Sequence, residues 1–385
     1  MSDPKEFDVV ILGGGMTGLT LAHHLVQSEH GEPAPPLKTL VIEPRSTYHR
    51  DKTWCYWQLD EAPFDAAITH KWSRWSVSCG GETHISENLA APYVRVDSGK
   101  FYDLAQSSIA ASDDVELRLD THATDITSHT DGFLVHSSAD TVQAKRVFDT
   151  RPVQTPAGTL LQHFVGWEIE TTNDVFDPTT VTLMDFATAA DDIHFFYVLP
   201  FSPRHALVET THFSTTVLED ATYAAEISGY LEKSLGVSEW RVLHEEKGVI
   251  PMPRRAPNLA CRSHPNLIPL GLHSDTAKPS TGYCYPHAQR QAYEQIKALL
   301  ADANCDASAA RSKLTRWFDA VFIGFLEQHP ERAGEIFLRL FKQVPSGALI
   351  RFLGDKAQPA DYVRVMTALP KKLFIRQALR HVSQP

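Results

Sequence analysis

The first 43 residues contain two short apolar runs on either side of one amphipathic segment. Residues 7–12 form a continuous apolar run, which is typical of a buried strand. Residues 16–28 place Leu19, Ala22 and Leu25 on one face, which predicts a helix. Residues 37–43 form a second buried strand after a proline-rich loop. This pattern predicts a strand–helix–strand unit of an α/β domain.

The pattern changes further along the chain. Alternating residues 115–119, the segment 133–135 after an Asp-Gly turn, and residues 141–148 predict an antiparallel meander. Further strands are expected at 181–186, 194–199 and 206–213. From residue 283 onwards the pattern is mainly helical, with amphipathic segments at 288–300 and 314–327 and several shorter helices beyond. The fold class we expect is α/β with an inserted antiparallel sheet and a helical C-terminal part.

The turn after the first strand carries the pattern G-x-G-x-x-G. Gly13 permits a tight turn, Gly15 allows the backbone to approach a pyrophosphate, and Gly18 lets the helix pack closely on the strand. Glu43 ends the second strand and can accept hydrogen bonds from ribose hydroxyls. The context favours a dinucleotide site, and the alternative is a glycine turn in some other α/β protein.

A second segment favours FAD as the dinucleotide. A strand expected at 266–271 is followed by Asp275 and then by Pro279-Ser-Thr-Gly282, which precedes a helix. In many two-domain flavoproteins such a helix N-terminus points at the flavin. Asp275 would then face the ribityl chain or pyrophosphate, and the amides of Thr281 and Gly282 the isoalloxazine. The alternative is a plain Pro/Gly turn before a helix.

Composition narrows the possible partners. The net charge of −11 argues against nucleic acid. The five cysteines show no CxxC spacing, and the 19 histidines form no HxH or HxxEH pattern, so no metal site or disulfide framework is expected. No run of 18 apolar residues occurs, and the charged start does not read as a signal peptide. We therefore expect a cytoplasmic protein with, at most, peripheral membrane contact.

Several motifs occur in an order that resembles the flavin-dependent lycopene cyclases of bacteria. Besides the glycine turn they are YHRDKTW (48–54), VFDTR (147–151), FVGWEIE (164–170), FDP (176–178), LMDF (183–186), LPFSPR (199–204), ETTH (209–212), GVIPM (248–252), PSTGY (279–283) and FLRLF (337–341). The resemblance implies a discontinuous FAD-binding domain at 1–50, 95–160 and 260–310, with Asp149 among its cofactor-binding residues. A β-sheet substrate domain would occupy 51–94 and 161–259, and a helical region 311–385.

The resemblance also implies an activity. Lycopene cyclisation is an isomerisation without net redox change that nonetheless needs reduced FAD, with NAD(P)H as the expected reductant. The product would be γ- or β-carotene, and the enzyme class an intramolecular lyase or isomerase. The alternative is an oxidoreductase of the same fold, such as a monooxygenase or prenyl reductase acting on a hydrophobic substrate. A non-catalytic flavin- or lipid-binding protein is a third alternative. Ring type, the number of cyclised ends and oligomeric state stay open.

Glu209 is the candidate catalytic acid, because period-two alternation places it beside Leu207 and Thr211 in an apolar setting that would raise its pKa. The sequence does not separate a proton donor from an ionised group that stabilises a cation. His212 should point the opposite way. The residues that could further line the site are Asp185, Trp54, Trp167 and Tyr283, although core packing explains each aromatic residue equally well.

Two C-terminal segments bear on membrane contact. Residues 314–326 carry an apolar stripe that ordinary core packing explains. Residues 371–380 are basic and amphipathic against an acidic whole, a pattern that suits either an anionic lipid surface or a packed terminal helix. We therefore expect peripheral association with the inner face of the cell membrane.

Overall fold

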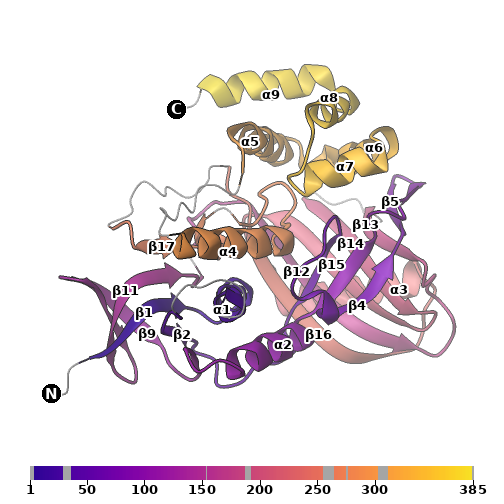
Figure 1. Ribbon diagram of the computed structural model, residues 1–385. Coiled ribbons are helices and arrows are strands. Elements are labelled where there is room, and N and C mark those ends of the chain that lie inside the picture. Colours follow the sequence, from indigo (N-terminus) through magenta and orange to yellow (C-terminus); the bar gives the residue numbers. More distant parts are fainter. Residues whose placement is uncertain are drawn as a thin grey trace.

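The protein is described by a computed structural model that covers residues 4–28, 36–152, 154–186, 192–254, 264–274, 276–301 and 311–383. Figure 1 shows two sheet-containing parts side by side, with a group of helices stacked over one of them. The N-terminal strand lies at one end of the molecule, and the last helices lie at the opposite end.

The N-terminal sheet has the order β8-β2-β1-β11-β10-β9, with β17 also paired to β11. Its strands are β1 (Lys5–Leu12), β2 (Thr39–Ile42), β8 (Val115–Arg118), β9 (Ala123–His129), β10 (Gly132–Ser137), β11 (Thr141–Asp149) and β17 (Leu267–Pro269). Strands β2, β1, β11 and β17 run parallel, and helix α1 (Met16–Ser28) buries its apolar face against them. The predicted strand–helix–strand unit is confirmed.

The predicted meander is partly wrong. Strand β8 pairs in parallel with β2 and is not part of the meander, which consists of β9, β10 and β11. Helix α2 (Ser98–Ala110) leads into β8 and makes it the end of a crossover connection. The sequence pattern did not predict strand β9, because its side chains are mostly exposed and polar.

The second large sheet has the order β16-β12-β15-β14-β13-β5-β6. Its strands are β5 (Arg74–Cys79), β6 (Glu82–Glu87), β12 (Leu161–Thr171), β13 (Thr180–Phe186), β14 (Ile193–Ser202), β15 (His205–Ser214) and β16 (Trp240–Pro251). The three strands predicted within 181–213 are confirmed as β13, β14 and β15. Helix α3 (Asp220–Lys233) packs on one face of this sheet through its own apolar cluster.

A third, three-stranded sheet lies between the two. Its strands lie in the order β3 (Thr53–Trp57), β7 (Tyr93–Asp97) and β4 (Ile68–Trp72). Along the chain, helix α2 directly follows β7. Tyr56, Val94 and Val96 of this sheet share a core with α1 and α2. Residues 51–94 are thus divided, since β5 and β6 join the second large sheet. The predicted domain boundaries stay a prediction.

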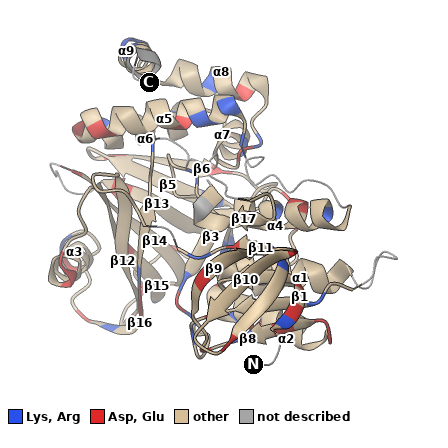
Figure 2. Ribbon diagram, turned by 90° about the vertical axis from the view of Figure 1, so that its left-hand side faces the viewer, with Lys and Arg blue, Asp and Glu red and all other residues tan. Residues whose placement is uncertain are grey.

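The C-terminal part is helical, as predicted. Its helices are α4 (Tyr285–Leu300), α5 (Lys313–Gln328), α6 (Ala333–Gln343), α7 (Ser346–Leu353), α8 (Pro359–Ala368) and α9 (Lys371–Ser383). The Ser312 side chain accepts a hydrogen bond from the Thr315 amide and caps α5, and Gln358 and Asp361 form a capping box on α8. Helix α4 packs on α1, whereas α5 to α8 share a core with the second large sheet, on the face opposite α3. Figure 2 shows α5, α8 and α9 together at one end of the molecule.

None of the helices in the described part of the chain combines the length and apolar character needed to cross a membrane.

Candidate active site

The glycine turn has the geometry that its spacing predicts. Gly13 has a φ of +94°, in the left-handed region that favours glycine. A Cβ on Gly18 would lie 1.9 Å from the Gly13 carbonyl oxygen, so no larger residue fits there. A Cβ on Gly15 would meet nothing within 4 Å. The space before Gly15 and the N-terminus of α1 therefore suits a pyrophosphate.

Glu43 lies beside this turn. Its Oε2 accepts a hydrogen bond from the Gly14 amide at 2.6 Å, and its Oε1 pairs with Arg45 at 2.7 Å. Asp149 ends the neighbouring strand β11 opposite Leu12, and Arg151 binds its carboxylate at 2.8 Å. Both predicted acids therefore lie at the carboxyl edge of the parallel sheet, where nucleotides bind in such folds.

The second flavin segment folds back onto this edge. Gly271 has a φ of +65°, and a Cβ there would lie 3.2 Å from Thr17 Oγ1 near the start of α1. The turn Gly271–Ser274 thereby lies beside the start of α1. Asp275 lies outside the described residues.

Two backbone amides of the loop 276–284 have partners within the turn, and their predicted contact with the isoalloxazine stays a prediction. The amides of Thr281 and Gly282 do not face open space, because both donate to the Lys278 carbonyl oxygen, at 3.1 and 2.8 Å. The turn closes on itself and satisfies its own donors. Thr281 and Gly282 line a cavity beside Gln162, whose buried Oε1 has no hydrogen-bond partner among the described residues. An unpaired acceptor at this position fits a hydrogen-bonding cofactor such as a flavin.

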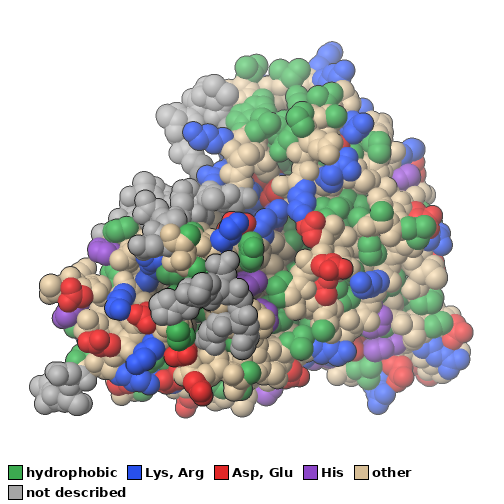
Figure 3. Space-filling view, in the orientation of Figure 1, with side chains coloured by type: hydrophobic (Ala, Val, Ile, Leu, Met, Phe, Trp, Pro, Cys, Tyr) green, Lys and Arg blue, Asp and Glu red, His purple; other side chains and the backbone are tan. Residues whose placement is uncertain are grey.

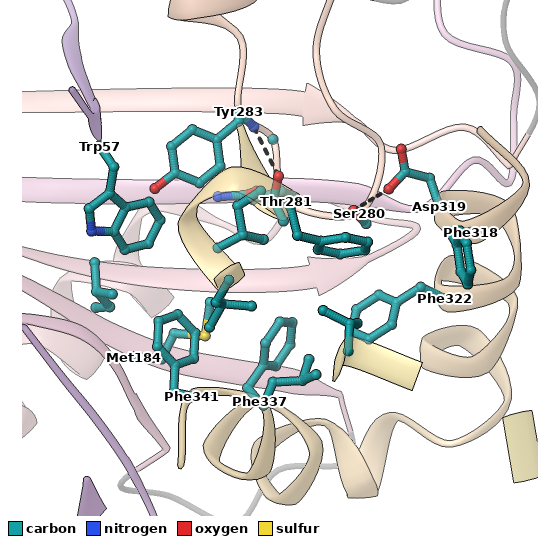
Figure 4. Close-up of a pocket in the computed structure, with 18 of the residues that line it drawn as sticks. Trp57, Met184, Ser280, Thr281, Tyr283, Phe318, Asp319, Phe322, Phe337 and Phe341 are labelled. Atoms are coloured by element: carbon teal, nitrogen blue, oxygen red, sulfur yellow. Dashed lines mark hydrogen bonds between the residues drawn. The ribbon is translucent and has the colours of Figure 1, made fainter. Parts of the chain in front are cut away.

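The cavity has a volume of about 580 Å³ and lies between β3, the second large sheet and the C-terminal helices. Its walls are mostly apolar and include many aromatic side chains. Figure 4 shows Trp57, Tyr283, Phe318, Phe322, Phe337 and Phe341 around it, with Met184 at one side. The lining continues to Val363, Met366 and Ile375 on α8 and α9, which are between 49% and 59% exposed. A long apolar ligand could therefore enter between these helices.

Glu209 lines the inner part of this cavity and is 8% exposed. Burial raises the pKa of its carboxyl group to about 8, although the Thr211 hydroxyl lowers it by donating to Oε1 at 2.6 Å. Glu209 is therefore largely protonated at neutral pH. A protonated carboxyl in an apolar cavity is suited to general acid catalysis.

Three hydroxyl or thiol side chains lie near Glu209. Tyr197 on β14 is its direct neighbour across the ladder, and its hydroxyl lies 3.1 Å from that of Tyr93. Cys55 also lines the cavity. Burial raises the pKa of Cys55 to about 12, so this thiol stays protonated.

The other predicted residues separate into two groups. Trp54 and Tyr283 line the cavity. Trp167 does not: it lies on the opposite face of the sheet and donates to Glu245 at 3.0 Å. Asp185 accepts a hydrogen bond from Tyr230 of α3 at 2.8 Å, and only its neighbours Leu183 and Met184 line the cavity.

His212 points away from Glu209, as its strand register predicts. It stacks between His163 and His194 of the adjacent strands, at centroid distances of 5.5 and 4.1 Å. Burial lowers the pKa of His212, but hydrogen bonds to Glu226 and Asp192 raise this pKa above its usual value.

One histidine cluster was missed in the sequence. Potential metal-ligand atoms of His194, His212 and Glu226 lie within 4.8 Å of one another. The two imidazole planes are parallel to within 5°, and both Nε2 atoms lie near Oε2 of Glu226, at 3.6 Å from His194 and 3.0 Å from His212. The cluster comes from β14, β15 and α3, which no spacing along a single segment reveals.

Two further groups of residues near the cavity were missed as well. Glu246 of β16 lies beside Glu209, and a buried ion cluster around Lys278 anchors the loop 276–284. Glu246 lies two residues before the motif GVIPM (248–252), and Lys278, directly before the motif PSTGY (279–283), was the available signal for the ion cluster.

The architecture is shared with solved flavoproteins. A flavoprotein/dehydrogenase from Cytophaga hutchinsonii superimposes with a TM-score of 0.63 at 12% identity, covering 98% of this chain and 100% of that chain. Together with the glycine turn and its acidic partner, this fold defines the class as two-domain FAD-type flavoproteins.

Within that class the family is also clear. The family model for lycopene cyclase protein matches residues 8–379, and the chain belongs to this family. It is 26% identical over 382 residues to a lycopene beta-cyclase from Paracoccus sp. (strain N81106 / MBIC 01143), covering 94% of each chain. It is 22% identical over 383 residues to a lycopene beta-cyclase from Pantoea ananas, covering 95% of each chain.

Proposed function

We propose that this chain cyclises the ends of linear lycopene to β-ionone rings, giving γ- or β-carotene without net redox change. The single observation that carries the proposal is the buried carboxyl group of Glu209 in the wall of an apolar cavity rich in aromatic side chains. An apolar polyene fits such a lining, and a neutral acid is what an unactivated alkene needs.

The reaction follows from these groups. The Glu209 carboxyl group transfers its proton to the terminal double bond, which leaves a tertiary carbocation. The neighbouring double bond attacks this cation and closes the six-membered ring. A ring proton then returns to the Glu209 carboxylate, so substrate and product have the same mass and the acid is regenerated. In between, the carboxylate and the aromatic faces of Tyr197 and Trp57 stabilise the positive charge.

A flavin is part of this proposal. The Gly13–Gly18 turn and Glu43 would hold the dinucleotide, and Gln162, Thr281 and Gly282 would contact the ring system. Reduced FAD, when bound, would supply electron-rich character that favours the cationic intermediate. NAD(P)H is the proposed reductant.

The test is an anaerobic incubation of the protein with FAD, NADPH and lycopene in liposomes. We expect cyclic carotenes of unchanged mass, together with NADPH loss well below one mole per mole of product. A linear product, or NADPH consumption mole for mole, would overturn the proposal and favour a redox enzyme of the same fold.

The substrate also predicts a membrane-facing entrance, and we propose that α8 and α9 form it. The apolar side chains Val363, Met366 and Ile375 are exposed at the mouth of the cavity. Lys371, Lys372 and Arg376 are exposed on the same helix as Ile375. Figure 3 shows hydrophobic side chains gathered at this end of the molecule with basic groups near them. Apolar and basic groups together suit the inner, anionic leaflet of a cell membrane.

We expect the double variant Met366→Asp/Ile375→Asp to sediment less with anionic vesicles, since two apolar contacts become charged. Each buried apolar side chain contributes about 1.5–3 kcal/mol on transfer from water, so binding should weaken at least tenfold. Turnover of liposomal lycopene should fall more than turnover of detergent-dispersed lycopene. Val242→Asp, which alters a 44%-exposed side chain on β16, is the control. Equal vesicle binding by the double variant and the wild type would contradict the entrance.

A further inference from the structure

Two carboxylic acids lie in one row across three strands of the second large sheet. Gly166 of β12 is the register partner of Glu209 on β15 and of Glu246 on β16. A Cβ on Gly166 would lie 3.5 Å from Cβ of Glu209 and 3.5 Å from Cγ of Glu246. Cβ of Glu209 and Cγ of Glu246 are therefore separated by at most twice 3.5 Å. Gly166 places no side chain between the two acids, and the nearest other atom to that position is Cδ1 of Leu207, at 3.1 Å.

Both acids are removed from solvent. Glu246 is 8% exposed, as is Glu209. Neighbouring Glu245 points to the opposite face and is exposed, as the period-two alternation of a strand requires. An acid placed on the inner face of a sheet is uncommon, because burial of a charge is unfavourable unless other groups compensate for it.

The surroundings of the two acids differ. Burial raises the pKa of Glu246, but a hydrogen bond with Thr53 and the nearby Arg95 favour its ionised form. Glu209 has the Thr211 hydroxyl as its favourable partner, and the charge of Glu246 disfavours its ionisation. The titratable and charged groups that face the pair from the packed elements are Arg50, Lys52, Cys55, Tyr93, Arg95, Asp97, Glu168, Tyr197, His244 and Tyr283. Their cations lie on the Glu246 side, whereas Glu209 faces tyrosines and a thiol.

We propose that Glu246 is a positioning residue for cyclisation: its carboxyl group faces Glu209 across Gly166 and keeps Glu209 in the protonated form that donates the proton. This inference rests on the proposed function. Glu246 ionises first because it has the cationic neighbours. Its negative charge then opposes the ionisation of Glu209, as in other pairs of carboxyl groups that share a site.

The test compares Glu246→Gln with the wild type in two measurements. In the pH profile of cyclisation, we expect the alkaline limb to move to lower pH by roughly half to one unit. Turnover in acidic buffer should stay close to wild type, because Glu209 is protonated there in both proteins. In an infrared titration of the resting protein, the carboxylic-acid band assigned by its loss in Glu209→Gln should disappear at correspondingly lower pH.

Glu245→Gln is the matched control, because it removes the same charge from the adjacent residue on the outer face of β16. This variant should shift neither the pH profile of cyclisation nor the infrared titration. An unchanged infrared titration in Glu246→Gln would overturn the inference whether or not the protein cyclises lycopene. A shifted titration in a protein that does not cyclise lycopene would support the coupled pair and reject the proposed function.

Discussion

Replacing Glu209 by glutamine is expected to abolish cyclisation while leaving the fold and the flavin site intact. Glutamine has nearly the same shape but has no proton to donate to an alkene. General acid catalysis contributes about 10²–10⁴-fold to rates, so we expect a loss of at least that order. The measurement is the initial rate of cyclic carotene formation under anaerobic conditions with reduced FAD.

The pH dependence of the wild type provides a second readout. Because burial raises the pKa of Glu209 to about 8, the acid form dominates below that pH and is lost above it. If Glu209 donates the proton, turnover should fall as the pH rises through about 8. If instead its ionised form were required, turnover should rise over the same range, and the proton-donor role would be contradicted.

The free energy of unfolding of Glu209→Gln shows whether its loss of activity is catalytic or results from misfolding. The folded state retains a proton on Glu209 between its ordinary pKa of 4.5 and about 8, whereas the unfolded chain releases it. This group therefore makes the free energy of unfolding decrease as the pH rises over that window. Glu209→Gln removes the effect and should unfold no more readily than wild type at pH 8. Glu239→Gln, which neutralises an exposed acid, should keep full activity.

Local patterns were sufficient to predict the nucleotide-binding edge. Apolar runs located β1, α1 and β2, and three glycines with an acid at the next strand end predicted the turn that the structure contains. These features depend on short-range geometry. Strand alternation likewise placed Glu209 and His212 on opposite faces of β15.

Features that join distant segments could not be predicted in the same way. Strand β8 was assigned to the wrong pairing, because alternation does not reveal which neighbour a strand binds. The amides of Thr281 and Gly282 were expected to face the isoalloxazine, and in the structure both donate to the Lys278 carbonyl oxygen. The pairing of Glu209 with Glu246 depends on the register of three strands about a glycine. Such contacts appear only once the sheet order is known.

The second large effect is expected at Lys278, whose side chain is fully buried at 0% exposure. Its ammonium group lies 2.9 Å from Asp319 of α5 and 2.8 Å from Asp355 after α7. Although burial alone would lower it, these carboxylates hold the pKa of Lys278 above its usual value. Arg311 and His287 complete the cluster by binding Asp355.

Lys278→Met should lower the free energy of unfolding by about 3–5 kcal/mol, because it removes the cation that pairs with the buried Asp319 carboxylate. Urea-induced unfolding with the flavin absent measures this change. Lys297→Met, on the exposed side of α4, is the control and should stay within about 0.5 kcal/mol of wild type. A decrease below about 1 kcal/mol for Lys278→Met would show that the remaining cations, or protonation of a carboxyl, compensate for the loss.

The same variant should weaken flavin binding, because the ion cluster holds the loop that faces the cavity. The Lys278 carbonyl accepts the Thr281 and Gly282 amides, and Ser280 donates to Asp319 at 2.6 Å. Once Lys278 no longer joins the loop to α5, both attachments lose their fixed position. FAD fluorescence quenching should therefore report a higher dissociation constant for Lys278→Met than for Glu209→Gln. Unchanged FAD affinity in a clearly destabilised variant would separate the ion cluster from the cofactor site and assign it to the C-terminal helices alone.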